Sequence, residues 1–177
     1  MAENEKFEEF MRRQQEPIHS ANWNEERNEW LRRLDDLYSC IGSFLSKYEQ
    51  IKTEYRDIRL EEEYVGSYTT KQMVLKIGRQ TVNIVPIGTV LIGSKGRVDV
   101  VGPIGRTQIV LVNSKAKSPL DLIRFDISIG DKPRAAAKEV PQSIQWAWKI
   151  VSRPPERRFE ELTRETFYKV LMDVTGG

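Results

Sequence analysis

Short apolar runs separated by glycine-containing turns occupy the middle of this sequence, between residues 72 and 112. The runs are QMVLKI, TVNIV, TVLI, RVDVV and TQIVLV, and the turns that contain glycine are GRQ, GSKG and GPIG. Runs of this length between tight turns are typical of neighbouring antiparallel strands. Pro86 lies between two of the runs and cannot donate to a sheet, so it indicates an edge or a bulge there. The pattern predicts an antiparallel meander.

Alternation of apolar and polar residues extends this prediction to both sides of the meander. Residues 58–65 alternate, as do LIRFDISI at 122–129 and IQWAWKIV at 144–151. In the last of these runs Trp146, Trp148 and Ile150 share one face, which we expect to belong to the core. The sequence therefore predicts six to seven strands, as a meander or a partly closed small barrel.

A long amphipathic helix precedes the predicted strands. Asn22 or Asn24 can cap it, and apolar residues then recur at heptad spacing as far as Tyr55. One row holds Leu34, Ile41, Tyr48 and Tyr55; the other holds Trp30, Leu37, Phe44, Ile51 and Ile58. A third row, Leu31, Tyr38 and Leu45, widens the apolar stripe and favours packing on the sheet over a coiled coil. Gly42 within the helix predicts a close contact.

Two further helices flank the chain, a short one over residues 7–16 and a closing one near the C-terminus. The closing helix is expected to begin with Phe159 and Leu162, with Thr163 as a second possible cap, and to end at Gly176. The chain is thus predicted to be α+β, with a helical segment over 1–56 packing on a β-meander and C-terminal helix over 57–177. We expect these two parts to form one integrated domain.

Charge is unevenly distributed along the chain, although the net charge is only +2. Residues 1–65 carry 10 Lys/Arg and 16 Asp/Glu, a balance of −6, whereas residues 66–153 carry 14 and 5, a balance of +9. The acidic helix can neutralise the basic segment by packing beside it. Alternatively, the basic segment forms a surface for an anionic partner.

Five cations in the two central hairpins are the candidate binding residues. They are Lys95, Arg97, Arg106, Lys115 and Lys117. An anionic protein or a nucleic acid would suit them, with Tyr68, Trp146 and Trp148 as possible stacking partners for bases. Arg97 and Asp99 lie two residues apart on one predicted strand, so a local ion pair is the simpler interpretation of both.

The stretch RVDVVGPIGRTQIVLVNSK resembles the metal-binding hairpin of PD-(D/E)xK nucleases. In that family an Asp on one strand and a Glu on the next hold a divalent metal, and a Lys helps to activate water. The resemblance implies these roles for Asp99 and Lys115. It covers about 20 residues, and Asn113 stands where the family has the second carboxylate. The helix that follows in the family is not indicated here.

Several chemistries are not supported by the sequence. The single histidine, His19, and single cysteine, Cys40, cannot build a nucleophilic triad or a metal site, and Lys follows Ser in GTVLIGSK, the reverse of a P-loop. We find no membrane-span candidate and expect no cofactor or metal. One cysteine fits a reducing cytosol. These observations predict a cytosolic, non-enzymatic binding or assembly module, with self-association possible through Trp30–Tyr55. The alternative is a metal-dependent nuclease, active or degenerate, that uses Asp99 and Lys115.

Overall fold

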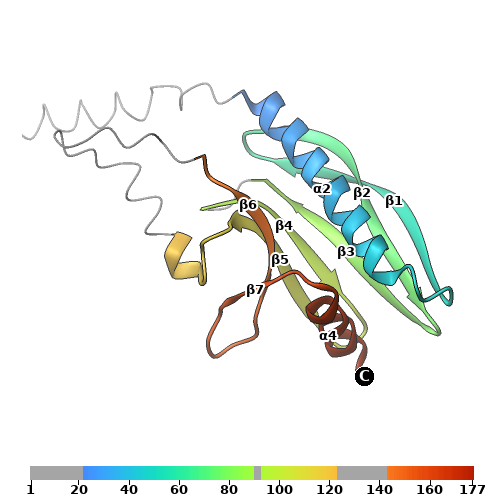
Figure 1. The fold of residues 1–177 in the computed structure, drawn as a ribbon. Coiled ribbons are helices and arrows are strands. Elements are labelled where there is room, and N and C mark those ends of the chain that lie inside the picture. Colours follow the sequence, from blue (N-terminus) through green and yellow to red (C-terminus); the bar gives the residue numbers. More distant parts are fainter. Residues whose placement is uncertain (1–21, 90–92, 123–142) are drawn as a thin grey trace, which may run out of the picture.

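The computed structural model describes residues 22–89, 93–122 and 143–177, and these residues form one open antiparallel sheet of seven strands. The strand order follows the sequence from β1 to β7 (Figure 1). The strands are β1 (Ile51–Glu62), β2 (Gly66–Ile77), β3 (Gln80–Gly88), β4 (Ser94–Val101), β5 (Arg106–Asn113), β6 (Trp146–Val151) and β7 (Phe159–Glu161). The predicted α+β meander is confirmed, and it is an open sheet, not a partly closed barrel.

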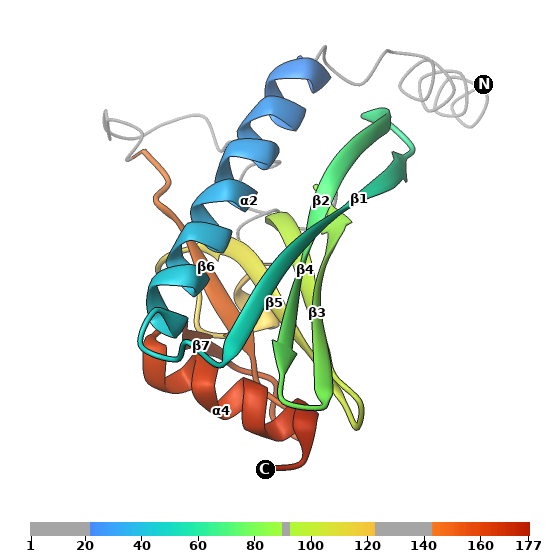
Figure 2. The same cartoon turned by 90° about the vertical axis from the view of Figure 1, so that its right-hand side faces the viewer.

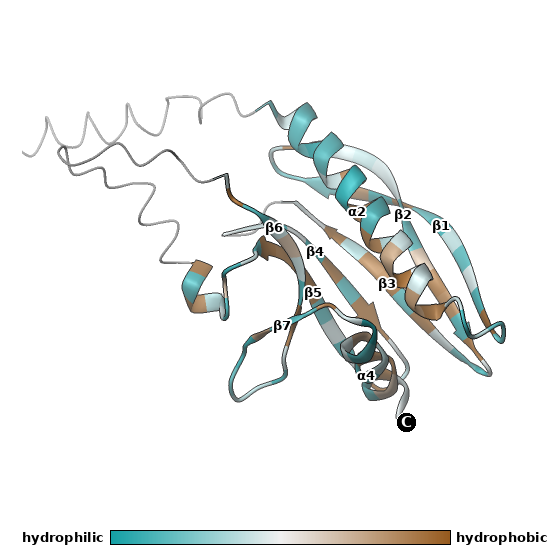
Figure 3. Cartoon of the chain, in the orientation of Figure 1, coloured by the Kyte–Doolittle hydropathy of each residue, from teal (hydrophilic) through white to brown (hydrophobic). Residues whose placement is uncertain are grey.

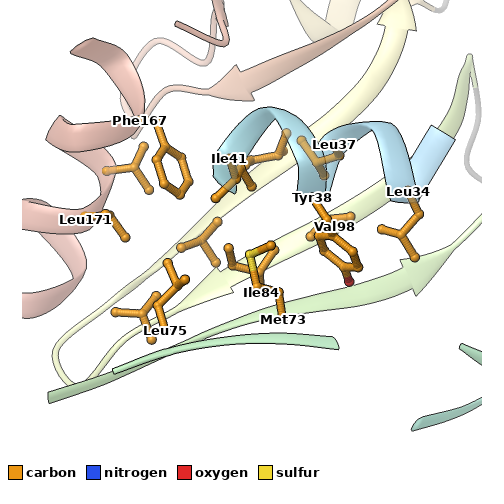
Figure 4. Close-up of a cluster of buried hydrophobic side chains, with 14 of the residues drawn as sticks. Leu34, Leu37, Tyr38, Ile41, Met73, Leu75, Ile84, Val98, Phe167 and Leu171 are labelled. Atoms are coloured by element: carbon orange, nitrogen blue, oxygen red, sulfur yellow. The ribbon is translucent and has the colours of Figure 1, made fainter. Parts of the chain in front are cut away.

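Helices α2 (Trp23–Leu45) and α4 (Arg164–Thr175) pack on the same face of this sheet. Over the strands, Ile41 of α2 lies beside Phe167 of α4, and Leu37 and Leu34 continue the same core further along α2, as the close-up in Figure 4 shows. The strands contribute every second side chain to this core, including Met73, Leu75, Ile84, Val98 and Val100. Burial of this apolar surface is the main driving force that holds the helices on the sheet.

Helix α2 begins as predicted but ends earlier. Asn22 occupies the cap position, and its carbonyl accepts from the backbone N–H groups of Glu25 and Glu26. The helix ends at Leu45, so the predicted continuation to Tyr55 is wrong. From Ile51 onward the chain is strand β1, which forms twelve rungs with β2. Those rungs satisfy the backbone polar groups on the β2 side of the strand.

The β1–β2 hairpin extends past the ends of β3 and β4 and lies beside α2 (Figure 2). Strand β2 buries Tyr68 and Thr70 in its first half but Met73 and Leu75 in its second half. The side chains of β2 that join the main core change from an even position to odd positions with no register shift against β1, which fits the strong twist of a two-stranded ribbon. The twisted end of the hairpin can therefore pack against the first turns of α2.

A carboxylate joins the far end of the hairpin to the end of β3. Glu62 accepts from the backbone N–H and the hydroxyl of Thr89, both at 2.8 Å, and from the hydroxyl of Tyr68. Burial raises the pKa of the Tyr68 hydroxyl, and the hydrogen bond to Glu62 raises it further. Gly88 leaves room for this carboxylate, since a Cβ there would lie 2.8 Å from Glu62 Cδ.

Two irregularities mark the β3–β4 hairpin. The register against β4 shifts between Pro86 and Gly88, so the predicted bulge at Pro86 is confirmed. The register of β4 against β5 shifts again between Ser94 and Gly96. Gly96 then lies directly beneath the indole ring of Trp30. These bulges change which side chains of β4 point toward the helices.

A second, smaller apolar cluster lies on the other face of the sheet, at the β5–β7 end. It consists of Val110, Val112, Ala116 and Leu122, with Val151 and Phe159 packed against it. Leu122 belongs to a short helical turn over 119–122, so the predicted strand over 122–129 is wrong at its first residue. The rest of that strand, the predicted helix over 7–16 and His19 lie outside the described residues.

The C-terminal helix begins later than expected. Phe159 lies in strand β7, which pairs with β6, and the prediction that Phe159 and Leu162 start the helix is wrong. Thr163 is the cap instead, and it forms a reciprocal capping box with Thr166. Gly176 ends the helix in the left-handed conformation with φ 86°, and its N–H donates to the Met172 carbonyl.

Candidate functional site

Strand β4 divides its side chains between the two faces of the sheet. Val98 and Val100 point into the core beneath the helices, so Arg97 and Asp99 point to the face of the sheet opposite α2 and α4. The register of the sheet extends this face to its neighbours, because opposed residues point to the same side. Asp99 is opposite Val85 on β3 and Gln108 on β5.

Two arginines hold the carboxylate of Asp99. Arg97 donates from Nε to Oδ1 at 2.7 Å and from Nη2 to Oδ2 at 2.8 Å. Arg106 Nη1 lies 3.6 Å from Oδ2. Asp99 is 2% exposed, whereas the side chain of Arg106 is 63% exposed. The predicted ion pair between Arg97 and Asp99 is confirmed, and its two parallel hydrogen bonds are the strong fork geometry of arginine with carboxylate.

A similar arrangement lies at the β1–β2 edge of the same face. Lys76 donates to Glu54, and Arg56 Nη2 lies 3.6 Å from the same carboxylate. The hydrogen bond from Lys76 lowers the pKa of Glu54, and the charge of Arg56 contributes in the same direction. The pairing of the strands connects the two networks. Glu54 on β1 is opposite Val74 on β2, Val74 is opposite Asn83 on β3, and Asn83 is opposite Val101 on β4. Val101 is two residues from Asp99 and so points to the same face. The two networks therefore share one face of the sheet.

We call this group of charges the cationic patch. Among the described residues it contains five cations and two carboxylates on strands β1 to β5. The cations are Lys52, Arg56, Lys76, Arg97 and Arg106, and the carboxylates are Glu54 and Asp99. Its formal charge is +3, and none of these positions is aromatic. Figure 3 shows how hydrophobic residues concentrate on the central strands while hydrophilic residues follow β1 and the first turns of α2.

The structure places Lys95 outside this patch. Lys95 is the residue between Ser94 and Gly96, where the register shifts. Its side chain points to the α2 side, where Nζ lies 3.2 Å from Glu29 and 3.8 Å from Glu26. It also lies 5.2 Å from the ring centre of Trp146, within the range of a cation–π contact. Lys95 therefore ties β4 to the acidic first half of α2, which is the neutralising arrangement considered from the sequence.

Lys115 and Lys117 lie in the turn after β5 and are exposed. The backbone N–H of Lys115 donates to Asn113 Oδ1, and that of Lys117 donates to Asp121 Oδ2, both at 2.9 Å. Arg106 begins the eight-residue strand β5, so the length of that strand, about 27 Å, separates it from this turn. The structure brings together Arg97 and Arg106, but not the five predicted cations as one cluster.

The nuclease-like arrangement is not assembled in the hairpin. Asp99 is opposite Gln108, five residues before Asn113, which corresponds to about 17 Å along the strand. Both oxygens of Asp99 are held by arginines. Among residues 22–89, 93–122 and 143–177, no group of three or more His, Cys, Asp or Glu side chains is placed to hold a metal. Asp99 and Lys115 therefore do not meet at one site.

Sequence reasoning missed Lys149, a buried lysine on β6. Its side chain is 5% exposed, and Nζ donates to the carbonyls of Ser114 at 2.7 Å and Ala116 at 2.9 Å and lies 2.9 Å from Glu161 Oε1. All three ammonium hydrogens thus have acceptors, and the lysine fixes the turn after β5 to β6. In WAWKIV, Lys149 alternates with Trp148 and Ile150, which were assigned to the core. This alternation places Lys149 on the other face of the strand, and it was the signal in the sequence that could have identified this lysine.

Lys52, Arg56 and Lys76 were also missed as members of the cationic patch. Lys52 and Arg56 lie in the segment that heptad spacing assigned to the helix.

Comparison with family models, with curated proteins and with solved structures gave no match. None of the helices in the described part of the chain is long and apolar enough to cross a membrane.

Proposed function

We propose that this protein is a non-enzymatic binding module that holds an acidic protein partner on the cationic patch. The observation that carries the proposal is the surplus of cations: in each of its two networks, two cations flank one carboxylate. One cation therefore satisfies the carboxylate, and a second is available to an external anion. Arg106, 63% exposed, is the clearest example.

The composition of the patch favours a protein partner over a nucleic acid. Glu54 and Asp99 lie among the cations and would repel a phosphate backbone. The neighbours of these charges on the same face, Val74, Asn83, Val85, Val101 and Gln108, offer no aromatic ring on which the bases of a single strand could stack. Arginine is enriched in protein–protein interfaces, and mixed charges suit a partner that carries mostly, but not only, acidic residues. A single cysteine in 177 residues supports a cytosolic location for this interaction.

The proposal is tested by binding of a fluorescein-labelled poly-L-glutamate peptide, followed by fluorescence anisotropy at low salt. The test variant combines Lys52→Glu with Arg106→Glu, both exposed cations of the patch. The control variant combines Arg32→Glu with Lys47→Glu, which are exposed on α2 and on the turn after it. Both variants change the net charge by the same amount, so only the location of the change differs.

We expect the patch variant to bind the peptide about tenfold or more weakly than the control variant, a difference of at least about 1.4 kcal/mol. Equal weakening in both variants would show that net charge alone attracts the peptide, and the proposal would fail. A 20-base-pair DNA duplex is measured in parallel. Tighter binding of the duplex than of the peptide, lost in the patch variant, would replace the protein partner by a nucleic acid.

A further inference from the structure

Strand β1 is an unusually long sheet edge. It has twelve residues, lies at the end of the strand order, and within the described residues pairs only with β2 on one side. The opposite edge, β7, has three residues. Proteins often protect edges by shortening them, by placing charged side chains along them, or with proline or a bulge; of these devices β1 has the charged side chains. β1 contains no proline or glycine, and its register with β2 is unbroken through all twelve rungs.

We infer that two copies of this chain pair antiparallel along their β1 strands, with the twofold axis at Tyr55. The inference rests on the strand edge and needs no partner on the cationic patch, but its register uses Glu54 and Arg56, which also belong to that patch; the network of Asp99 with Arg97 and Arg106 lies outside β1. The apolar rows of α2 cannot provide this contact, because Leu34, Leu37 and Ile41 are at most 1% exposed in the core of the same chain. An edge-to-edge contact needs only backbone groups and compatible side chains.

The charges of β1 select the register. In a symmetric antiparallel pair, opposed side chains lie on the same face, so their residue numbers differ by an even number or are equal. With Tyr55 opposite itself, Glu54 is opposite Arg56 of the second copy, and this pair occurs twice. Residues 51–59 then form nine rungs with no like charges opposed.

Neighbouring registers are less favourable. Centring the pair on Glu54, Arg56 or Asp57 opposes that charge to itself. Centring it on Ile58 opposes Glu54 to Glu62 of the second copy, again twice. Like charges directly opposite each other destabilise a sheet. The register at Tyr55 is therefore the longest one in which the charges of the two strands are compatible.

The edge is also accessible. Tyr55 is 51% exposed, although its ring contacts Tyr38 of α2 at 5.8 Å between centroids. Thr53, Asp57 and Arg59 lie on the same side of the strand as Tyr55 and are exposed. Helix α2 therefore does not cover the outer edge of β1. A second strand can approach without displacing it.

Cysteine cross-linking tests the register directly. In a Cys40→Ser background, Tyr55→Cys places one thiol opposite its symmetry mate, at the Cα separation of roughly 4.5–5.5 Å that a disulfide spans. Thr53→Cys is the matched control, because its two copies would lie four residues apart along the strand, about 14 Å. We expect mild oxidation to give a covalent dimer from Tyr55→Cys and not from Thr53→Cys.

Charge exchange provides a second test, with oligomeric state measured by light scattering after size-exclusion chromatography. We expect a dimer for the wild type, a monomer for Glu54→Arg and for Arg56→Glu, and a dimer again for the double exchange. Circular dichroism confirms that each variant is folded.

A wild type that stays monomeric at the highest soluble concentration would overturn the inference. So would equal cross-linking at both cysteine positions, or a double exchange that is folded but monomeric. Peptide binding to the cationic patch is measured separately with Lys52 and Arg106 variants, so either proposal can fail while the other stands.

Discussion

Gly96 of β4 lies beneath the indole ring of Trp30 of α2, and replacing it by alanine tests how tightly the helix and the sheet are packed. A Cβ at this position would lie 2.5 Å from Cε3 of Trp30 and closer still to Cζ3. Trp30 is 1% exposed and its ring also contacts Trp148, with centroids 6.1 Å apart. The indole cannot move toward solvent, so either α2 or β4 must shift to admit the methyl group.

The expected cost is that of overpacking a core, about 1–3 kcal/mol of unfolding free energy. For a chain of this size that lowers the melting temperature by roughly 2–4 °C per kcal/mol. The measurement is urea unfolding followed by far-ultraviolet circular dichroism, for the wild type and Gly96→Ala. The same substitution is repeated in a Trp30→Phe background, where the smaller ring leaves space for the methyl group.

Gly42→Ala is the matched control, with the opposite sign expected. Gly42 is exposed in the middle of α2, and a Cβ there meets nothing within 4 Å, so the close contact predicted from the sequence is wrong. Alanine should stabilise the helix by about 0.5–1 kcal/mol. The packing argument is refuted if Gly96→Ala lowers the free energy of unfolding by less than Gly42→Ala raises it. It is also refuted if the loss caused by Gly96→Ala is unchanged in the Trp30→Phe background.

Three further predictions concern charge and burial. Arg97→Leu leaves the buried Asp99 carboxylate with only the distant contact to Arg106, and should lower the free energy of unfolding in urea by about 3 kcal/mol. Arg97→Leu combined with Asp99→Leu should lower it much less, and equal losses would contradict this. Burial raises the pKa of the Tyr38 and Tyr68 hydroxyls. Their contribution to the free energy of unfolding should therefore be fully present below about pH 10 and should decline as the pH rises above it. The double variant Tyr38→Phe/Tyr68→Phe should flatten that decline in urea titrations between pH 9 and 11, and an unchanged slope would rule out these tyrosines as its source. Lys149→Ala removes three contacts at one buried ammonium and should lower the free energy of unfolding by about 2–4 kcal/mol. Amide hydrogen exchange in the turn after β5 should become faster. A loss below about 0.5 kcal/mol would mean that the contacts to Ser114 and Ala116 contribute little.

The strands were predicted more reliably than the helix ends because their signals are local. The turns GRQ and GPIG and the alternation of RVDVV set where the chain reverses and which residues share a face. The same alternation is enough to pair Arg97 with Asp99. The end of α2 was misplaced because Ile51 and Tyr55 are four residues apart, a spacing that fits both one helical turn and one face of a strand.

The cationic patch was predicted only in part. Arg97 and Arg106 share a face, as expected, but Lys95 points to the opposite side because the register shifts at Ser94/Gly96. A bulge of one residue reverses the face of every side chain before it, and sequence alternation does not reveal its position. Lys115 and Lys117 lie beyond the end of β5, in a turn, and so do not follow the alternation of the strand at all.

The sequence by itself determined the order of elements, the antiparallel connectivity and the local caps and ion pairs, because each depends on residues only a few positions apart. The tertiary structure decided where α2 ends and which cations gather on the face of the sheet opposite α2 and α4. It also decided that β1 forms a long sheet edge. These features depend on the pairing of strands distant from one another in the chain, such as β1 with β2 and β4 with β5, and on the bulges that set their register. Backbone pairing over twelve rungs outweighs a helical periodicity that would have continued through Tyr55.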